Sequence, residues 1–201
     1  MYCCTIDIPS EIDEKRLYTL RDKYQIPDEV NPCLAALGEW CCTSNSGVFI
    51  YEAYLLGGLR LPLNAFAREL LHRLGIGPNQ LNPNAWRIIV SMQVLWREVF
   101  DGNCPLTMDE FLYYYKPSEI SKSLGFYQFL ARGSSFRLIR SLPLFDRRWK
   151  TVFFFVSGYW VGNPVEVDMD LFPPYTGEMG HLHSKGMLPF LAHLPYSIIL
   201  V

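Results

Sequence analysis

The chain has 201 residues, of which 50% are hydrophobic, and a formal net charge of −2. This composition excludes an intrinsically disordered chain and is sufficient for one domain with a sizeable core. The near-neutral charge gives no whole-chain attraction to nucleic acid or to an anionic membrane. No apolar run reaches the length of a membrane span. The first residues lack the basic flank and apolar stretch of a signal peptide, so we expect an intracellular protein, nuclear or cytoplasmic.

The first predicted helix covers residues 10–24. Ser10 is its predicted cap, with Asp13 at the spacing of a capping box and in the place of the usual Glu. Pro27 then ends the helix. Its apolar residues recur at helical spacing: Leu17, Leu20 and Tyr24. Residues 28–47 are rich in turn-forming residues and are predicted to be irregular.

Two further helices are predicted on either side of Gly57-Gly58. A short one covers residues 48–56, and the next begins near Pro62, a residue suited to a first helical turn. Gly75 is placed to end the second of these helices. The apolar stripe of this helix consists of Leu63, Phe66, Leu70 and Leu74.

The clearest helix signal begins at Asn82, a predicted N-cap that is followed by Pro83. This helix is predicted to run from 83 to about 100 and to end at Asp101-Gly102. Its predicted buried side consists of Trp86, Ile89, Val90, Gln93, Trp96 and Val99 or Phe100. A capping box formed by Thr107 and Glu110 then predicts a short helix over about 108–115. We expect its Tyr113-Tyr114-Tyr115 run to pack against other aromatic groups.

The pattern then changes to short aromatic and β-branched segments at 125–131, 136–141 and 149–157. These predict an antiparallel β-meander, whose last strand is apolar at consecutive positions and therefore buried on both faces. Helices followed by strands define an α+β fold. We expect one domain over residues 1–160, and an irregular tail over 161–201 that has diverged or is disordered.

Two groups of residues could bind metal ions, and each group also has an interpretation that involves no metal. The six cysteines are Cys3-Cys4, Cys33, Cys41-Cys42 and Cys104, and their spacing favours buried or incidental thiols over a zinc site. Glu166, Asp168 and Asp170 alternate, so on a strand their carboxylates could converge on the metal ions of a transposase. The same pattern is typical of a solvated edge strand, which we favour. We predict no metal and no cofactor.

Enzyme motifs are absent from the sequence. It contains no Asp-Thr-Gly or Asp-Ser-Gly of a retroviral-type protease and no Tyr-x-Asp-Asp of a reverse transcriptase. A Gly-x-Ser-x-Gly elbow and a Walker-type phosphate loop are also missing. We predict no catalytic residues and favour a protein that is not an enzyme.

One local cluster of positive charge suggests nucleic-acid binding. It consists of Arg132, Arg137, Arg140, Arg147, Arg148 and Lys150, with Asp146 as the single opposing charge. Phe136, Phe145 and Trp149 lie among these cations, so guanidinium groups could contact phosphates while the rings stack on bases. The alternative, which we favour, is a strand surface that is basic by ordinary alternation.

Several ordered blocks resemble one known family. They include Tyr24-Gln25-Ile26-Pro27-Asp28, Val48-Phe49-Ile50-Tyr51-Glu52-Ala53, Gly58-Leu59-Arg60-Leu61-Pro62-Leu63, Gln80-Leu81-Asn82-Pro83-Asn84-Ala85-Trp86-Arg87, Gly125-Phe126-Tyr127 and Trp149-Lys150 with Phe153-Phe154-Phe155-Val156. In this order they resemble the plant domain family called "putative gypsy-type transposon", also called putative transposase of gypsy type, over about residues 17–160.

The resemblance implies descent from, or residence in, a retrotransposon-related reading frame and implies no catalytic residues. We therefore expect a non-enzymatic interaction or structural module of a plant retrotransposon-derived protein, with a protein partner or self-association and no membrane. The alternative is a nucleic-acid-binding, transposase-like protein.

Overall fold

The computed structural model describes residues 9–36, 47–144 and 147–162. The helices are α1 (Glu14–Tyr24), α2 (Glu52–Leu56), α3 (Ala65–Leu74), α4 (Pro83–Val99) and α5 (Met108–Tyr114). The strands are β1 (Pro32–Cys33), β2 (Val48–Tyr51), β3 (Tyr115–Ile120), β4 (Ser123–Ala131) and β5 (Phe153–Val156). Short 3-10 turns are η1 (Asp28–Val30), η2 (Pro78–Gln80), η3 (Ser134–Phe136) and η4 (Arg147–Thr151). The predicted α+β class is confirmed.

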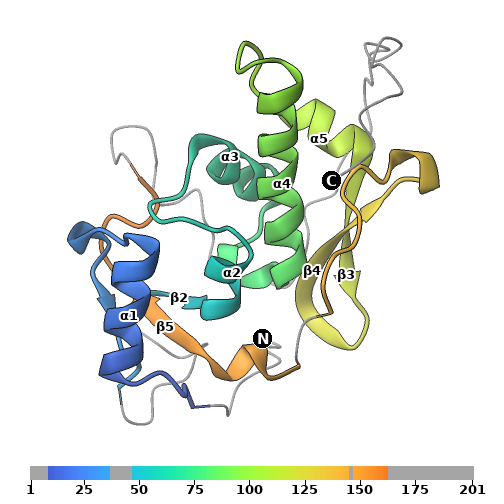
Figure 1. Cartoon of the computed structure of the whole chain (residues 1–201). Helices are drawn as coiled ribbons and strands as arrows, with labels where there is room; N and C mark the ends of the chain where they lie inside the picture. Colours follow the sequence, from blue (N-terminus) through green and yellow to red (C-terminus); the bar gives the residue numbers. More distant parts are fainter. Residues whose placement is uncertain (1–8, 37–46, 145–146, 163–201) are drawn as a thin grey trace.

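The strands form two antiparallel sheets with α4 between them (Figure 1). In the first sheet β5 is the central strand and pairs with β1 on one side and β2 on the other. All four residues of β5 are fully buried, which confirms the prediction made from their consecutive apolar side chains. The second sheet is the β3–β4 hairpin.

The prediction of one meander over residues 125–157 is wrong in its connectivity. Residues 125–131 do form a strand, but they pair with β3, which the sequence reasoning assigned partly to a helix and otherwise missed. Residues 136–141 form no strand. Phe136 packs on the rings of Tyr113 and Tyr114, and the backbone N–H of Ile139 donates to the Tyr115 hydroxyl at 2.9 Å, so contacts with the side chains of these tyrosines replace a strand ladder.

The start of α1 also differs from the prediction. Asp13, and not Ser10, is the N-cap, because its Oδ1 accepts from the backbone N–H of Arg16 at 2.7 Å. The Ser10 hydroxyl instead donates to the carbonyl of Phe153 and thereby holds the N-terminal segment against β5. The predicted buried residues of this helix are confirmed: Leu17, Leu20 and Tyr24.

The segment predicted as one helix over 48–56 contains a strand and a helix. Its first half is β2, since the aromatic and β-branched residues Val48–Tyr51 pair with β5. Only Glu52–Leu56 is helical. The next helix begins at Ala65 with Asn64 as its cap, and Pro62 precedes it in a cis peptide bond with Leu61. Gly75 ends α3 with a φ of 63°, as predicted.

Helix α4 confirms its predicted start, since Asn82 is the N-cap and Pro83 the first helical residue. The side-chain Oδ1 of Asn82 accepts from Ala85 N at 2.7 Å, and its backbone N–H donates to Tyr127 O at 2.9 Å, which ties the helix to β4. The buried side is wider than predicted and includes Ala85, Ile88 and Met92 in addition to Trp86, Ile89 and Trp96. Val90 and Gln93, predicted to be buried, are half-buried.

The core between the first sheet and α4 is mostly aromatic. Tyr51 lies at its centre, with ring centroids 4.6 Å from Trp149 and 5.2 Å from Tyr54. Trp86 of α4 joins this group at 6.0 Å from Tyr54. Such edge-to-face contacts add stability beyond the burial of apolar area. The aromatic packing predicted for the Tyr113–Tyr115 run is also confirmed, because Tyr113 and Tyr114 contact Phe136 and Tyr115 stacks on Phe111.

Candidate functional site

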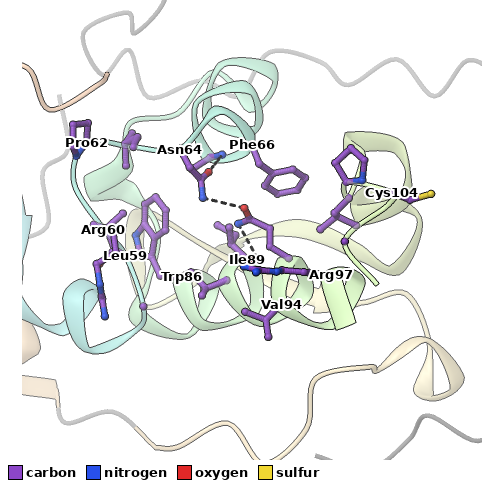
Figure 2. A pocket seen from close by; sticks show the side chains of 18 residues that line it. Leu59, Arg60, Pro62, Asn64, Phe66, Trp86, Ile89, Val94, Arg97 and Cys104 are labelled. Carbon is purple, nitrogen blue, oxygen red and sulfur yellow. Dashed lines mark hydrogen bonds between the residues drawn. The ribbon is translucent and has the colours of Figure 1, made fainter. Parts of the chain in front are cut away.

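A groove with a volume of about 740 Å³ lies between α3, α4 and the two loops that flank them (Figure 2). We call it the α3–α4 groove. Its apolar lining consists of Leu59, Pro62, Leu63, Phe66, Ala67, Trp86, Ile89, Val90, Val94, Pro105 and Leu106. Its remaining residues are Gly58, Arg60, Asn64, Gln93, Arg97, Gly102 and Cys104. None of the described residues that line it carries a carboxylate.

The first wall of the groove depends on the close approach of a loop to α4. Gly58 has a φ of +97°, and a Cβ placed there would lie 3.0 Å from Val90 Cγ1. Only glycine permits both this backbone conformation and this contact. The Gly57-Gly58 pair therefore does more than end a helix. It brings residues 59–63 against the face of α4 that presents Trp86 and Val90.

A hydrogen bond between two side-chain amides joins α3 to α4 within the groove (Figure 2). Asn64 Nδ2 donates to Gln93 Oε1 at 3.0 Å, and Gln93 Nε2 donates to the carbonyl of Ile89 at 3.2 Å. Asn64 Oδ1 also accepts from Ala67 N at 2.8 Å and so caps α3. The two amides fix the spacing of the helices that form the groove.

Two guanidinium groups supply the positive charge of the groove. Arg60 donates to the carbonyls of Leu55 and Leu59 and lies 5.0 Å from the ring centroid of Tyr24, so its position is fixed. Arg97 is exposed on the last turn of α4 and forms no ion pair within the described part of the chain. In Figure 2, Arg60 lies near one end of the groove and Cys104 at the other. The exposed fraction of Val94 is 54%, which places an apolar side chain in water beside Arg97.

The predicted basic residues differ in their exposure. Arg132, Arg137, Arg140 and Arg148 are exposed, and the side chain of Arg147 lies outside the described residues. Lys150 is turned toward the protein: its Nζ lies 4.0 Å from the ring centroid of Phe126 and donates to Ser123 Oγ at 3.2 Å. Trp149 is buried and Phe136 packs on two tyrosines, so neither ring is available for stacking on a base.

The other chemical candidates fall largely outside the described residues. Glu166, Asp168 and Asp170 do so, as do Cys3, Cys4, Cys41 and Cys42. Of the remaining thiols, Cys33 is half-buried and Cys104 is exposed. Among residues 9–36, 47–144 and 147–162, no three His, Cys, Asp or Glu side chains lie close enough together to hold a metal ion. In the same residues, every helix is too short or too polar to cross a bilayer.

The groove lies entirely within the one segment that matches a known family. Residues 48–117 match the family described as "Putative gypsy type transposon". This confirms the predicted resemblance over that segment, which includes α2 to α5 and every residue of the α3–α4 groove. No curated protein and no solved structure matches the chain. The segment that is similar to the transposon family therefore contains the whole described lining of the groove.

Sequence reasoning missed the groove although it identified its parts. Val90 and Gln93 were assigned to the buried side of α4 because they share the helical period of Trp86 and Ile89. The sequence did contain one signal of the groove: Gln93 lies in an apolar stripe, and a buried amide needs a hydrogen-bond partner on a neighbouring element. Its partner Asn64 was not recognised, because the predicted start of α3 at Pro62 placed Asn64 inside the helix instead of at its cap.

Proposed function

We propose that this chain is a non-enzymatic interaction module of a protein derived from a plant retrotransposon. In this proposal the α3–α4 groove binds a peptide segment that has both apolar and acidic side chains. The observation that supports it best is the lining of the groove, whose described residues combine apolar side chains with Arg60 and Arg97 and include no carboxylate. The location of the groove within the transposon-related segment gives further support.

The chemistry of the groove defines its ligand. Leu59, Phe66 and Val90 offer apolar surface, whose burial against a ligand is favourable by about 25 cal/mol per Å². The exposed guanidinium of Arg97 favours a carboxylate and disfavours an ammonium group, because charge complementarity sets specificity. An apolar segment with regularly placed acidic residues satisfies both requirements. The hydrogen bond between the amides of Asn64 and Gln93 fixes the shape of the groove before a ligand binds. Binding therefore costs little conformational entropy of the groove.

The test uses the full chain and two synthetic peptides. One alternates Val or Leu with Glu, and the other has Lys in place of each Glu. We expect the acidic peptide to shift the NMR signals of Val94 and Arg97 and the basic peptide to leave them unchanged. Arg97→Glu should abolish the shift of the Val94 signal, whereas Lys122→Glu, the same charge change at an exposed hairpin residue, should preserve it. Equal binding of both peptides, or of neither, would contradict the proposal.

The non-enzymatic part of the proposal has a separate test. The full chain should not cleave DNA in the presence of Mg²⁺ or Mn²⁺. Cleavage that disappears when Asp168 is replaced by Asn would show that the carboxylate cluster holds catalytic metal, and would contradict this assignment.

A second candidate function, nucleic-acid binding, is supported by the exposure of Arg132, Arg137 and Arg140. These side chains could contact phosphates without any stacking on bases. Binding of this kind weakens steeply as salt increases, because condensed counterions are released from the nucleic acid. Replacement of Arg137, Arg140 and Arg148 by Gln should reduce this salt dependence. Absence of binding to DNA and RNA at low salt would remove this candidate.

A further inference from the structure

We propose that the α3–α4 groove is occupied by residues 165–172 of the same chain, Val-Glu-Val-Asp-Met-Asp-Leu-Phe. The inference rests on the proposed function and specifies its ligand: the module contains its own groove-binding segment, with which an outside peptide must compete. These residues lie outside the described part of the chain. Three observations support the assignment: where the described chain ends, what the groove attracts, and how the two are connected.

The described chain ends beside the groove. The backbone N–H of Leu63, a lining residue, donates to the carbonyl of Trp160 at 2.9 Å. Arg68 Nη1 then donates to the carbonyls of Leu63 and Val161, at 3.0 and 3.2 Å. Gly162 follows with a φ of +102°, and a Cβ there would collide with the same guanidinium. The chain is therefore fixed against the start of α3 up to residue 162.

The distance to the groove is short. Residue 165 follows Gly162 by three positions, and three extended residues span about 10 Å. The lining residues of α4, Trp86 to Arg97, span about 16 Å along the helix. An extended segment of eight residues reaches about 27 Å. Residues 165–172 can therefore cover the groove without any rearrangement of the described residues.

The chemistry of the segment matches the groove. Its apolar residues are Val165, Val167, Met169, Leu171 and Phe172, and its acidic residues are Glu166, Asp168 and Asp170. In an extended backbone Val165, Val167, Met169 and Leu171 lie on one face, and the acidic residues lie on the other together with Phe172. The apolar face can cover Phe66, Val90 and Val94. The acidic side chains then lie toward the rim, where Arg97 is exposed. In this arrangement the three carboxylates pair with the charge of Arg97 and do not bind a metal ion.

The covalent connection makes a weak contact sufficient. A short linker gives an effective concentration in the mM range, which exceeds the dissociation constant of a contact as weak as about 0.1 mM by about tenfold. Most molecules would then have the groove filled. A free acidic peptide should consequently bind about tenfold more weakly to the natural chain than to a chain whose segment cannot dock.

The experiment places a nitroxide spin label on Cys104, at the end of the groove, in the full chain with its other five cysteines replaced by Ser. We expect the label to broaden the amide signals of residues 165–172 more strongly than those of residues 180–201. Arg97→Glu should remove this broadening. A label at residue 122, introduced by Lys122→Cys with Cys104→Ser, serves as the distant control. Equal broadening along the whole tail, or none, would overturn the proposal.

A second measurement needs no cysteine replacement. In the otherwise natural chain, reversal of the three acidic residues to Lys should shift the NMR signals of Val94 and Arg97 and should increase the affinity for the acidic probe peptide about tenfold. Unchanged signals and unchanged affinity would overturn the proposal. If the acidic peptide still binds in that case, the proposed function stands and only its internal ligand is wrong. If it does not bind, both fail.

One further sample separates this arrangement from a second copy in the groove. Spin-labelled protein at natural isotope abundance is mixed with unlabelled ¹⁵N protein. Broadening of residues 165–172 that appears in this mixture as strongly as within one chain would assign the groove to a neighbouring molecule and would overturn the proposal. If the mixture shows no such broadening, the segment docks in the groove of its own chain.

Discussion

Asn64 caps α3 through its Oδ1 and binds α4 through its Nδ2, which donates to Gln93 at 3.0 Å. One side chain thus defines where a helix begins and how far it lies from its neighbour. We expect Asn64→Ala to reduce the free energy of unfolding by about 1–2 kcal/mol, since both the cap and the bond between helices are lost. Asn64→Ser should cost less, because serine also caps a helix but does not reach Gln93. Urea unfolding of both variants is the measurement. Equal losses would show that the cap contributes nothing, and an unchanged stability of Asn64→Ser would show that the amide pair contributes nothing.

Gly58 and Gly102 offer a matched pair of substitutions, since both line the groove and both have positive φ. A Cβ at Gly58 would lie 3.0 Å from Val90, whereas a Cβ at Gly102 would meet nothing within 4 Å. Gly102→Ala should therefore cost about 1 kcal/mol, from backbone strain alone. Gly58→Ala should cost about 2 kcal/mol or more, because strain and overpacking add. Denaturation midpoints that change by the same amount would contradict the close approach of the loop to α4.

Trp86 is one of the two tryptophans that α4 places in the core, with 1% of its surface exposed. Trp86→Ala should reduce the free energy of unfolding by about 3–5 kcal/mol through loss of contacts and formation of a cavity. Trp86→Phe should cost less. It keeps the aromatic contact with Tyr54 and removes the indole N–H, which is buried and has no hydrogen-bond partner in the described structure. An unchanged midpoint for Trp86→Ala would refute its role in the core.

Burial raises the pKa of the Tyr115 hydroxyl, an effect that hydrogen bonds from the backbone of Ile139 and Leu138 partly oppose. The folded state then holds the phenolic proton more tightly than the unfolded state. The stability that the Tyr115 hydroxyl contributes should therefore be fully present below pH 10, the ordinary pKa of a tyrosine. It should be lost as the pH rises through the pKa of Tyr115 in the folded protein. Tyr115→Phe should make the alkaline loss of stability less steep. Parallel pH profiles for both proteins would contradict this.

The same substitution has an effect at neutral pH. Phenylalanine cannot accept the hydrogen bond from Ile139 N, so Tyr115→Phe should cost about 1 kcal/mol at pH 7. Tyr113→Phe is a suitable control, because Tyr113 is only half-buried and packs on Phe136 mainly through its ring. It should leave the stability at pH 7 nearly unchanged.

The position of the domain boundary also leads to a prediction. Trp160 and Val161 are buried, and both of their carbonyls accept hydrogen bonds from the start of α3. A chain that ends after Gly162 should keep one cooperative unfolding transition. A chain that ends after Gly158 should be markedly less stable, since it loses a buried tryptophan, these two hydrogen bonds and the one that Tyr159 N donates to the carbonyl of Glu29. Calorimetry of both chains is the measurement. Equal stability would place the true boundary before Tyr159.

Local signals in the sequence were sufficient for some elements. The start of α4 was predictable because Asn82 and Pro83 form a cap within four residues, and α5 was predictable from the capping box of Thr107 and Glu110. The burial of β5 followed from its unbroken apolar run. In each case the interaction that fixes the element lies within a few positions of the chain, so no knowledge of distant partners was needed.

Other elements depend on distant partners. Val48–Tyr51 is a strand only because β5 pairs with it, and Ser10 leaves its predicted capping role because Phe153 offers a carbonyl. Residues 136–141 have strand-like composition, yet their groups bind Tyr113 and Tyr115. The α3–α4 groove was unpredictable for the same reason. Its form is set by the contact of Gly58 with Val90 and by the amide pair, which join segments about 30 residues apart.

The central position of β5 has a consequence for synthesis of the chain. The ribosome produces β1 and β2 first, and neither pairs with the other in the finished sheet. β2 must wait about 100 residues for β5, a delay of roughly 5–20 seconds at ordinary translation rates, and β1 must wait longer. During that interval Phe49 and Tyr51 have no sheet partner, although both are buried in the finished protein. The transposon-related segment of residues 48–117 would remain in this incomplete state if it were made alone, and we expect it to need a chaperone or to aggregate until β5 is added.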